Sequence, residues 1–151
     1  MNPIGSTAAF ALASLLLAVS TVHAQDAGIS ERGSRYSVPE TVEKIETTAR
    51  SRGLTVFARI DHSGEAQKAG LKMPATQLIV LGSPKAGTPV MLAAPGSAID
   101  LPLKVLVREA PDGRTVVAIN DAKWLQSRHG IPADLMKPLS GLPGLLAAAL
   151  D

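Results

Sequence analysis

The hydrophobic positions of the chain follow two spacings, and each spacing predicts one kind of element. Val42, Ile45 and Ala49 recur three to four residues apart, after Pro39 and before Gly53. Proline is favoured in the first turn of a helix and glycine just past its end. This spacing therefore predicts a helix from about residue 39 to 52 with one face packed on a sheet.

Alternating apolar residues predict the strands. Leu54, Val56, Ala58 and Ile60 are separated by single residues, which predicts a half-buried strand with these four side chains on one face. A continuous apolar run predicts a second strand that is buried on both faces. That run covers 77–81, and the other predicted strands cover 35–38, 103–107 and 115–119, the last two joined in a hairpin by Pro111-Asp112-Gly113.

Cap and turn residues divide the rest of the chain into short helices. One or two turns are predicted from Glu65 to Ala69, a helix is predicted to start at Thr88-Pro89 and reach Ala94, and Asp121 is predicted to cap a helix that ends near Arg128. Two prolines interrupt the leucine-rich C-terminal segment. We expect that segment to be helical only in pieces, chiefly from Leu145 onward.

The order of these elements predicts an α+β fold. A strand-rich middle between helices is typical of an antiparallel or mixed sheet, here of four to five strands, with helices packed mainly on one face. Phe57, Leu106 and Val116 are predicted to point from the opposite face. An apolar face of this kind is usually covered, so we expect the C-terminal segment, a second subunit or a ligand to lie on it.

The start of the chain predicts export. An apolar run at 8–22 is followed by Val22-His23-Ala24, whose small residues suit a signal peptidase. We therefore divide the chain into a signal peptide at 1–24, a flexible mature N-terminus at 25–34, a globular α+β domain at 35–130 and a C-terminal helical segment at 131–151 packed on that domain. The alternative is an uncleaved anchor. The predicted location is periplasmic or secreted, with no stable membrane insertion after cleavage.

Charge and composition exclude several classes of partner and site. The formal net charge is +2 and the basic residues are dispersed, so we expect no nucleic acid partner. The chain has no cysteine, which excludes disulfides, thiolate metal sites and a cysteine nucleophile. We expect no cofactor and no bound metal, whereas a small-molecule ligand and a second copy of the chain are the partners we consider.

A glycine-flanked segment, Gly82-Ser83-Pro84-Lys85-Ala86-Gly87-Thr88, lies between a predicted strand and a predicted helix, as a phosphate-binding loop does. Because Thr88 directly follows Gly87, the phosphate-binding lysine of that motif is missing, and a nucleoside triphosphatase is not expected. Thr88 and the following amides, with Lys85 nearby, are candidates for holding a carboxylate or phosphate. The alternative is a plain turn in which Thr88 caps the helix.

Asp61 and His62 form a second polar corner, with Glu65 three residues further on. This arrangement is compatible with ligand binding, with proton transfer, or with a metal site if His129 came close. The alternative is that Asp61 or Ser63 caps the short helix. A Gly-x-Ser-x-Gly nucleophile motif does not occur in the sequence.

The two corners are predicted to lie side by side at the ends of neighbouring strands. The resulting hypothesis is a non-catalytic binding module for a small polar or anionic ligand. One alternative is an enzyme in which Asp61 orients His62 as general base, and another is a homodimeric interaction module. No catalytic residue is assigned, and the predicted ligand-binding residues are Asp61, His62, Gly82, Ser83, Lys85, Gly87 and Thr88.

Several motifs in fixed order resemble a family of bacterial proteins known as domain of unknown function 302. They are Gly53-Leu54-Thr55-Val56-Phe57, Arg59-Ile60-Asp61-His62, Gly82-Ser83-Pro84-Lys85-Ala86-Gly87-Thr88 and Leu101-Pro102-Leu103-Lys104-Val105-Leu106-Val107. The resemblance covers about 36–130. It implies a compact β-α-β-β-β-β-α fold, similar to the TATA-binding-protein-like arrangement and often dimeric, and it implies no established activity. Ser83 departs from the asparagine that the family usually shows.

Overall fold

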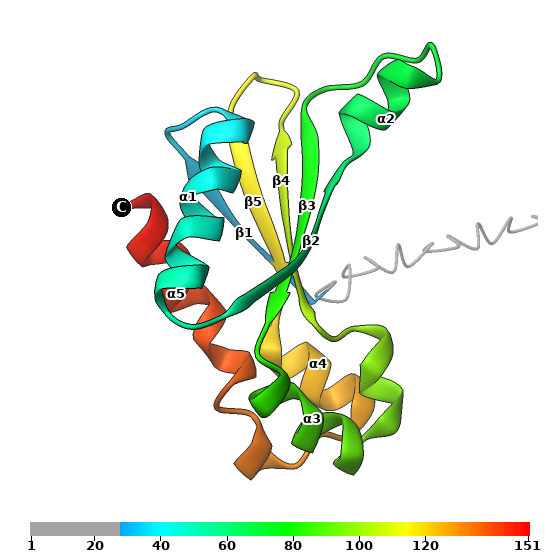
Figure 1. Ribbon diagram of the computed structural model, residues 1–151, viewed down its shortest axis with the longest axis vertical. Coiled ribbons are helices and arrows are strands. Elements are labelled where there is room, and N and C mark those ends of the chain that lie inside the picture. The colour runs from blue at the N-terminus through cyan, green and yellow to red at the C-terminus, as the bar shows by residue number, and fades with distance from the viewer. Residues whose placement is uncertain (1–27) are drawn as a thin grey trace, which may run out of the picture.

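The structure is a computed structural model, and it describes residues 28–151. Five strands and five α-helices make up this part of the chain (Figure 1). The strands are β1 Ile29–Ser34, β2 Thr55–Asp61, β3 Thr76–Gly82, β4 Leu103–Glu109 and β5 Thr115–Asn120. The helices are α1 Val38–Ser51, α2 His62–Lys68, α3 Pro84–Ala93, α4 Ala122–His129 and α5 Leu142–Leu150. Short 3-10 turns lie at Pro95–Ile99, Ala133–Leu135 and Leu139–Gly141.

The strands form one antiparallel sheet in the order β1-β5-β4-β3-β2. The predicted α+β class with a sheet of up to five strands is therefore confirmed. β1 lies at one edge of the sheet beside β5, and α1 crosses the sheet to the opposite edge, where β2 begins. This crossover leaves β1 and β2 as the two edge strands.

Helix α1 begins and ends as its sequence predicts. The Ser37 side chain accepts from the Glu40 amide while the Glu40 side chain accepts from the Ser37 amide, which is a complete capping box. Val42, Ile45 and Ala49 are fully buried on the sheet. The predicted helix and its buried face are thus both confirmed.

The predicted first strand at 35–38 is wrong, because β1 lies at Ile29–Ser34, within the segment predicted to be a flexible N-terminus. Its residues are mostly polar and exposed, so the apolar pattern gives no signal. The strand is specified by pairing instead: β1 follows β5 from Ile29 opposite Asn120 to Ser34 opposite Thr115. An ion pair with β4 supports it, between Arg108 and Glu31 at 2.9 Å. The predicted signal peptide at 1–24 lies outside the described residues.

Strand β2 does not keep the single apolar face predicted for it. Its register with β3 shifts between Val56, opposite Leu81, and Ala58, opposite Val80, which leaves Phe57 without a partner in a bulge. One extra residue reverses the facing of every residue after it. Leu54 and Val56 consequently share the helix-covered face with Leu81, whereas Ala58 and Ile60 lie on the opposite face.

Helices α1 and α5 cover the same face of the sheet (Figure 1). The C-terminal segment is helical from Leu142, three residues earlier than predicted, since Pro143 is accommodated in its first turn. Leu142, Leu145, Leu146 and Leu150 are buried against α1 and the sheet. The C-terminal segment therefore does not cover the opposite face, where Ile60, Leu78, Val80, Leu106 and Val116 remain partly exposed.

Candidate functional site

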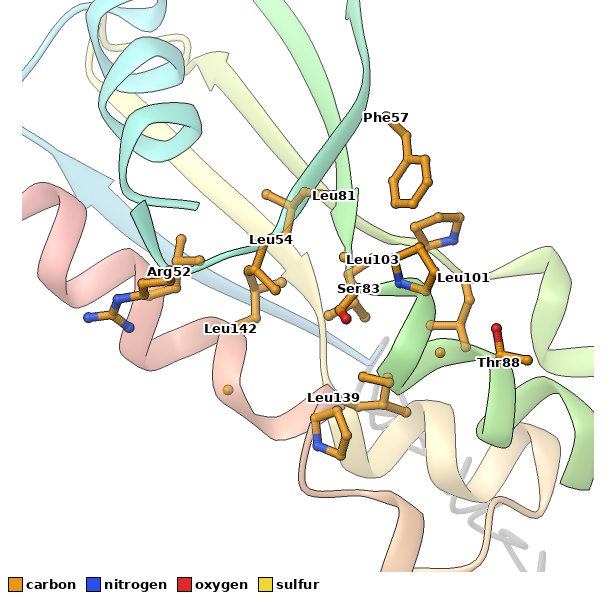
Figure 2. Close-up of a pocket in the computed structure, with 18 of the residues that line it drawn as sticks. Arg52, Leu54, Phe57, Leu81, Ser83, Thr88, Leu101, Leu103, Leu139 and Leu142 are labelled. Atoms are coloured by element: carbon orange, nitrogen blue, oxygen red, sulfur yellow. The ribbon is translucent and has the colours of Figure 1, made fainter. Parts of the chain in front are cut away.

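A cavity of about 440 Å³ lies at the end of the sheet where β2 begins and β3 ends. Its walls come from the loop after α1, from β2, β3 and β4, from α3, and from the start of α5. Figure 2 shows the lining side chains, with Arg52 at one end, Leu54 and Leu142 along the middle, and Thr88 at the other end. Most of the lining is apolar, and the polar side chains in it are Arg52, Ser83 and Thr88.

The cavity lies where two hydrophobic clusters meet. One cluster is the core between the sheet and helices α1 and α5, and it includes Leu81, Leu142 and Leu145. The second cluster lies under α3 and α4 and includes Leu101 and Leu139. Leu103 packs against both clusters. Elements that diverge from one sheet end leave a gap between these clusters, and this gap is the cavity.

Helix α3 starts earlier than predicted and supplies one wall. It begins at Pro84, and its Ala86 and Gly87 amides donate to the Ser83 carbonyl at 3.0 and 2.8 Å. Thr88 therefore lies inside the helix and does not cap it, so both the predicted helix start and the predicted cap are wrong. Pro84 suits the first helical position, and both Gly87 and Pro89 lie inside the helix.

The glycine-flanked segment is brought to the cavity only in part. Gly82, Ser83, Gly87 and Thr88 all line it, as four of the predicted binding residues. Lys85 is exposed and lies outside the lining. The Ser83 side chain makes no capping hydrogen bond, which leaves its hydroxyl available to the cavity.

Asp61 and His62 lie at the other end of the hairpin, so the prediction that the two corners converge is wrong. In the β2–β3 register, Thr55 is opposite Gly82 whereas Asp61 is opposite Gln77. Adjacent antiparallel strands place the end of one beside the start of the next. Figure 1 accordingly shows α2, which follows Asp61, at the opposite end of the molecule from α3.

The Asp61 carboxylate starts helix α2. It accepts hydrogen bonds from the Ser63 hydroxyl at 2.7 Å and from the Gly64 amide at 2.9 Å. These bonds, the Ser63 hydroxyl first, hold the pKa of the Asp61 carboxyl below its usual range. The capping alternative is confirmed for Asp61. His62 is exposed at the first position of α2, far from the cavity.

His129 has a partner that the sequence did not indicate. Its Nε2 lies 2.6 Å from Oδ2 of Asp100, and Nε of Arg128 lies 3.3 Å from the same oxygen. Both side chains of the His129–Asp100 pair are largely buried. The pair ties the C-terminal end of α4 to the turn at Pro95–Ile99. Helix α4, which ends at His129, and helix α2, which begins at His62, lie at opposite ends of the molecule (Figure 1).

Sequence reasoning missed most of the cavity lining. In the sequence, Arg52 is only the last residue of the predicted helix at 39–52, and Leu139 and Leu142 are only parts of the interrupted, leucine-rich C-terminal segment. Each of these residues carries an ordinary structural signal in its own part of the chain. Only the fold brings them together with Ser83, so no local pattern could have identified them as one site.

Residues 28–151 show neither a metal-binding cluster nor a membrane-spanning helix. No group of three or more acidic, histidine or cysteine side chains there is placed to hold a metal ion. None of the helices in this range combines the length and apolar character that crossing a bilayer requires.

Similarity to known proteins places the chain in a family. Residues 30–148 match the model described as "Domain of unknown function DUF302". Over 106 residues the chain is 40% identical to proteins named "Fluoride-specific ion channel FluC 1" from Brucella suis biovar 1 (strain 1330) and Brucella abortus biovar 1 (strain 9-941). The match covers 70% of this chain but only 42% and 39% of those relatives.

A solved structure has the same fold. The crystal structure of an uncharacterised conserved DUF302 protein from Bacillus stearothermophilus superposes with a TM-score of 0.69 at 19% sequence identity. The superposition covers 83% of this chain and 97% of that structure. The family match over most of the described residues and the shared α+β fold agree, and the chain belongs to the DUF302 family.

Proposed function

We propose that this DUF302 domain is an exported, non-catalytic binding module that holds a small, mainly apolar molecule in the cavity at the end of the sheet. The observation that carries the proposal is the cavity itself, a preformed space of about 440 Å³ between the two hydrophobic clusters. Small-molecule sites are commonly concave, mainly apolar and about 300–1,000 Å³ in volume. The cavity fits that description in both size and lining.

The lining favours an apolar ligand over the small polar ligand that the sequence suggested. Burying a polar group without a hydrogen-bond partner is unfavourable, and the cavity offers few partners. Ser83 and Thr88 supply one hydroxyl each, and Arg52 supplies the charged group. A ligand made mostly of hydrocarbon would remove the surfaces of several leucines from water without leaving polar groups unpaired.

The geometry argues against the alternative of an enzyme based on Asp61 and His62. Asp61 uses its carboxylate to hold the first turn of α2, and the adjacent imidazole faces solvent. A general base must lie within hydrogen-bonding reach of a bound substrate. The cavity is at the opposite end of β2, so we place ligand binding there and assign no catalytic residue.

Export remains part of the proposal and rests on the leader sequence alone. The small residues of Val22-His23-Ala24 predict cleavage after Ala24. Expression of the full chain in a bacterial host, followed by N-terminal sequencing of the secreted or periplasmic material, should give Gln25 as the first residue. Recovery of a chain that still begins at Met1 in the membrane fraction would contradict this.

Fluorescence of N-phenyl-1-naphthylamine, a neutral apolar probe, tests binding. We expect saturable enhancement with the wild-type protein. Ala86→Phe places a large side chain in the cavity wall and should abolish the enhancement. The control is Ala93→Phe, at an exposed position of the same helix outside the lining, which should keep the enhancement. If the probe does not bind, or if both variants bind it like the wild type with unchanged melting curves, the proposal is wrong.

A further inference from the structure

We propose that the ligand of this cavity is an aliphatic carboxylate, with its alkyl chain among the leucines and its carboxylate on the Arg52 guanidinium. The inference rests on the proposed function of the cavity and adds the chemical class of the ligand. Its basis is the position of the only charged side chain among the residues that line the cavity.

The charge of the lining is unbalanced. Arg52 contributes one positive charge, and no aspartate or glutamate lines the cavity. Arg52 is exposed at the end of the cavity, and within residues 28–151 no acidic side chain forms an ion pair with it. An unmatched guanidinium beside an apolar cavity favours a ligand with one negative charge.

Arg52 also keeps free hydrogen-bond donors. Its Nη1 donates to the Gly144 carbonyl at 3.4 Å, a long contact that joins the end of α1 to α5. A guanidinium has five N–H donors in a planar fork, and this fork matches the two oxygens of a carboxylate. The contact with Gly144 therefore orients the side chain and leaves donors available for a ligand.

The arrangement matches an amphipathic molecule. Figure 2 shows Arg52 at one end of the lining, with its guanidinium directed away from the leucines, and Leu54 and Leu142 next to it. A carboxylate bound there would stay near solvent while its chain ran inward along the leucines. Arg52 caps the C-terminal end of α1, where the helix dipole disfavours an anion, so the guanidinium itself must supply the attraction.

Competition against N-phenyl-1-naphthylamine tests the inference with three ligands of equal chain length: decanoate, decanol and decyltrimethylammonium. We compare wild-type protein, Arg52→Gln, and the control Arg50→Gln, whose arginine pairs with Glu46 at 3.0 Å and does not line the cavity. The preference for decanoate over decanol should fall about tenfold in Arg52→Gln. It should stay unchanged in Arg50→Gln, with probe affinity retained in both variants.

The outcomes separate this inference from the function on which it rests. If the probe binds but decanoate shows the same preference over decanol in wild type and Arg52→Gln, the carboxylate assignment is wrong and the apolar cavity stands. Equal competition by decyltrimethylammonium and decanoate would also overturn it. If the probe does not bind the wild-type protein at all, the proposed function fails and this inference fails with it.

Discussion

The Asp61 carboxylate caps the start of helix α2 in the structure, although the sequence predicts Asp61 as a ligand-binding residue. Its oxygen accepts from the Ser63 hydroxyl and the Gly64 amide, and the Ser63 hydroxyl in turn accepts from the Thr76 amide at 3.3 Å. These bonds join the start of α2 to the start of β3. The side chain is thus committed to local structure, which is the usual role of aspartate before a helix.

The first prediction concerns the pH dependence of α2. Because the pKa of folded Asp61 is depressed, its contribution to the helix is present above the pKa of an unfolded aspartate and is lost as the pH falls through the folded value. NMR titration of the α2 amides should show this transition below the usual range of aspartate. Asp61→Asn keeps a capping side chain and should remove the transition, and an identical titration in both proteins would contradict the assignment.

A second prediction concerns Gly28, which is buried beside the single tryptophan. A Cβ at Gly28 would lie 2.1 Å from Cγ of Trp124, and the residue has a φ of +66°. Gly28→Ala should therefore destabilise the fold by about 1–3 kcal/mol. Gly33→Ala is the control, since a Cβ there meets nothing within 4 Å, and it should change stability by less than about 0.5 kcal/mol. Urea unfolding followed by Trp124 fluorescence measures both, and equal stabilities would contradict the prediction.

At the scale of elements, the sequence best predicted those elements whose signals lie within one short segment of the chain. Helix α1 was predictable because its cap, first-turn proline and buried face all lie within fifteen consecutive residues. β1 was not, since its polar residues gain a strand conformation only by pairing with β5. The bulge at Phe57 could not be predicted either, because an extra residue is recognised only by comparing the strand with the register of its partner.

The third prediction tests the packing of α5 on α1. Leu146 is 2% exposed in the main core, so Leu146→Ala should cost about 2–5 kcal/mol of unfolding free energy. Leu92 on α3 is 78% exposed, and Leu92→Ala should change stability by less than about 0.5 kcal/mol. Chemical denaturation of both variants measures the difference. A loss at Leu146 no larger than at Leu92 would show that α5 does not belong to the core.

At the scale of the whole molecule, the two ends of the sheet have different roles. One end carries α2 and the Asp61 cap, and the other carries the cavity between α3 and α5 (Figure 1). Four of the seven predicted binding residues line that cavity, because the sequence alone predicts the junction between a strand end and the following helix. The rest of the lining comes from distant segments such as those of Leu54 and Leu145, which are 91 residues apart in the chain, and no pattern in one sequence relates them.

The sheet face opposite α1 and α5 leads to the fourth prediction. Ile60 is 39% exposed there, and Leu78, Val80 and Leu106 beside it are partly exposed. We propose that a second copy of the chain covers this face, because apolar surface of this kind is usually buried. Light scattering of residues 25–151 should give the mass of a dimer. Leu78→Asp should give a monomer and Leu92→Asp, on exposed α3, should not. A monomeric wild type would contradict the proposal.

The central claim is that this domain binds an apolar molecule at the end of the sheet between its two hydrophobic clusters. The most direct measurement is a map of backbone amide shifts in a ¹H–¹⁵N spectrum as N-phenyl-1-naphthylamine is added. The account predicts saturable shifts at Leu54, Leu81, Ser83, Leu103 and Leu142, with Asp61 and His62 unchanged. Shifts confined to α2 or to the open sheet face, or no saturable shifts at all, would contradict it.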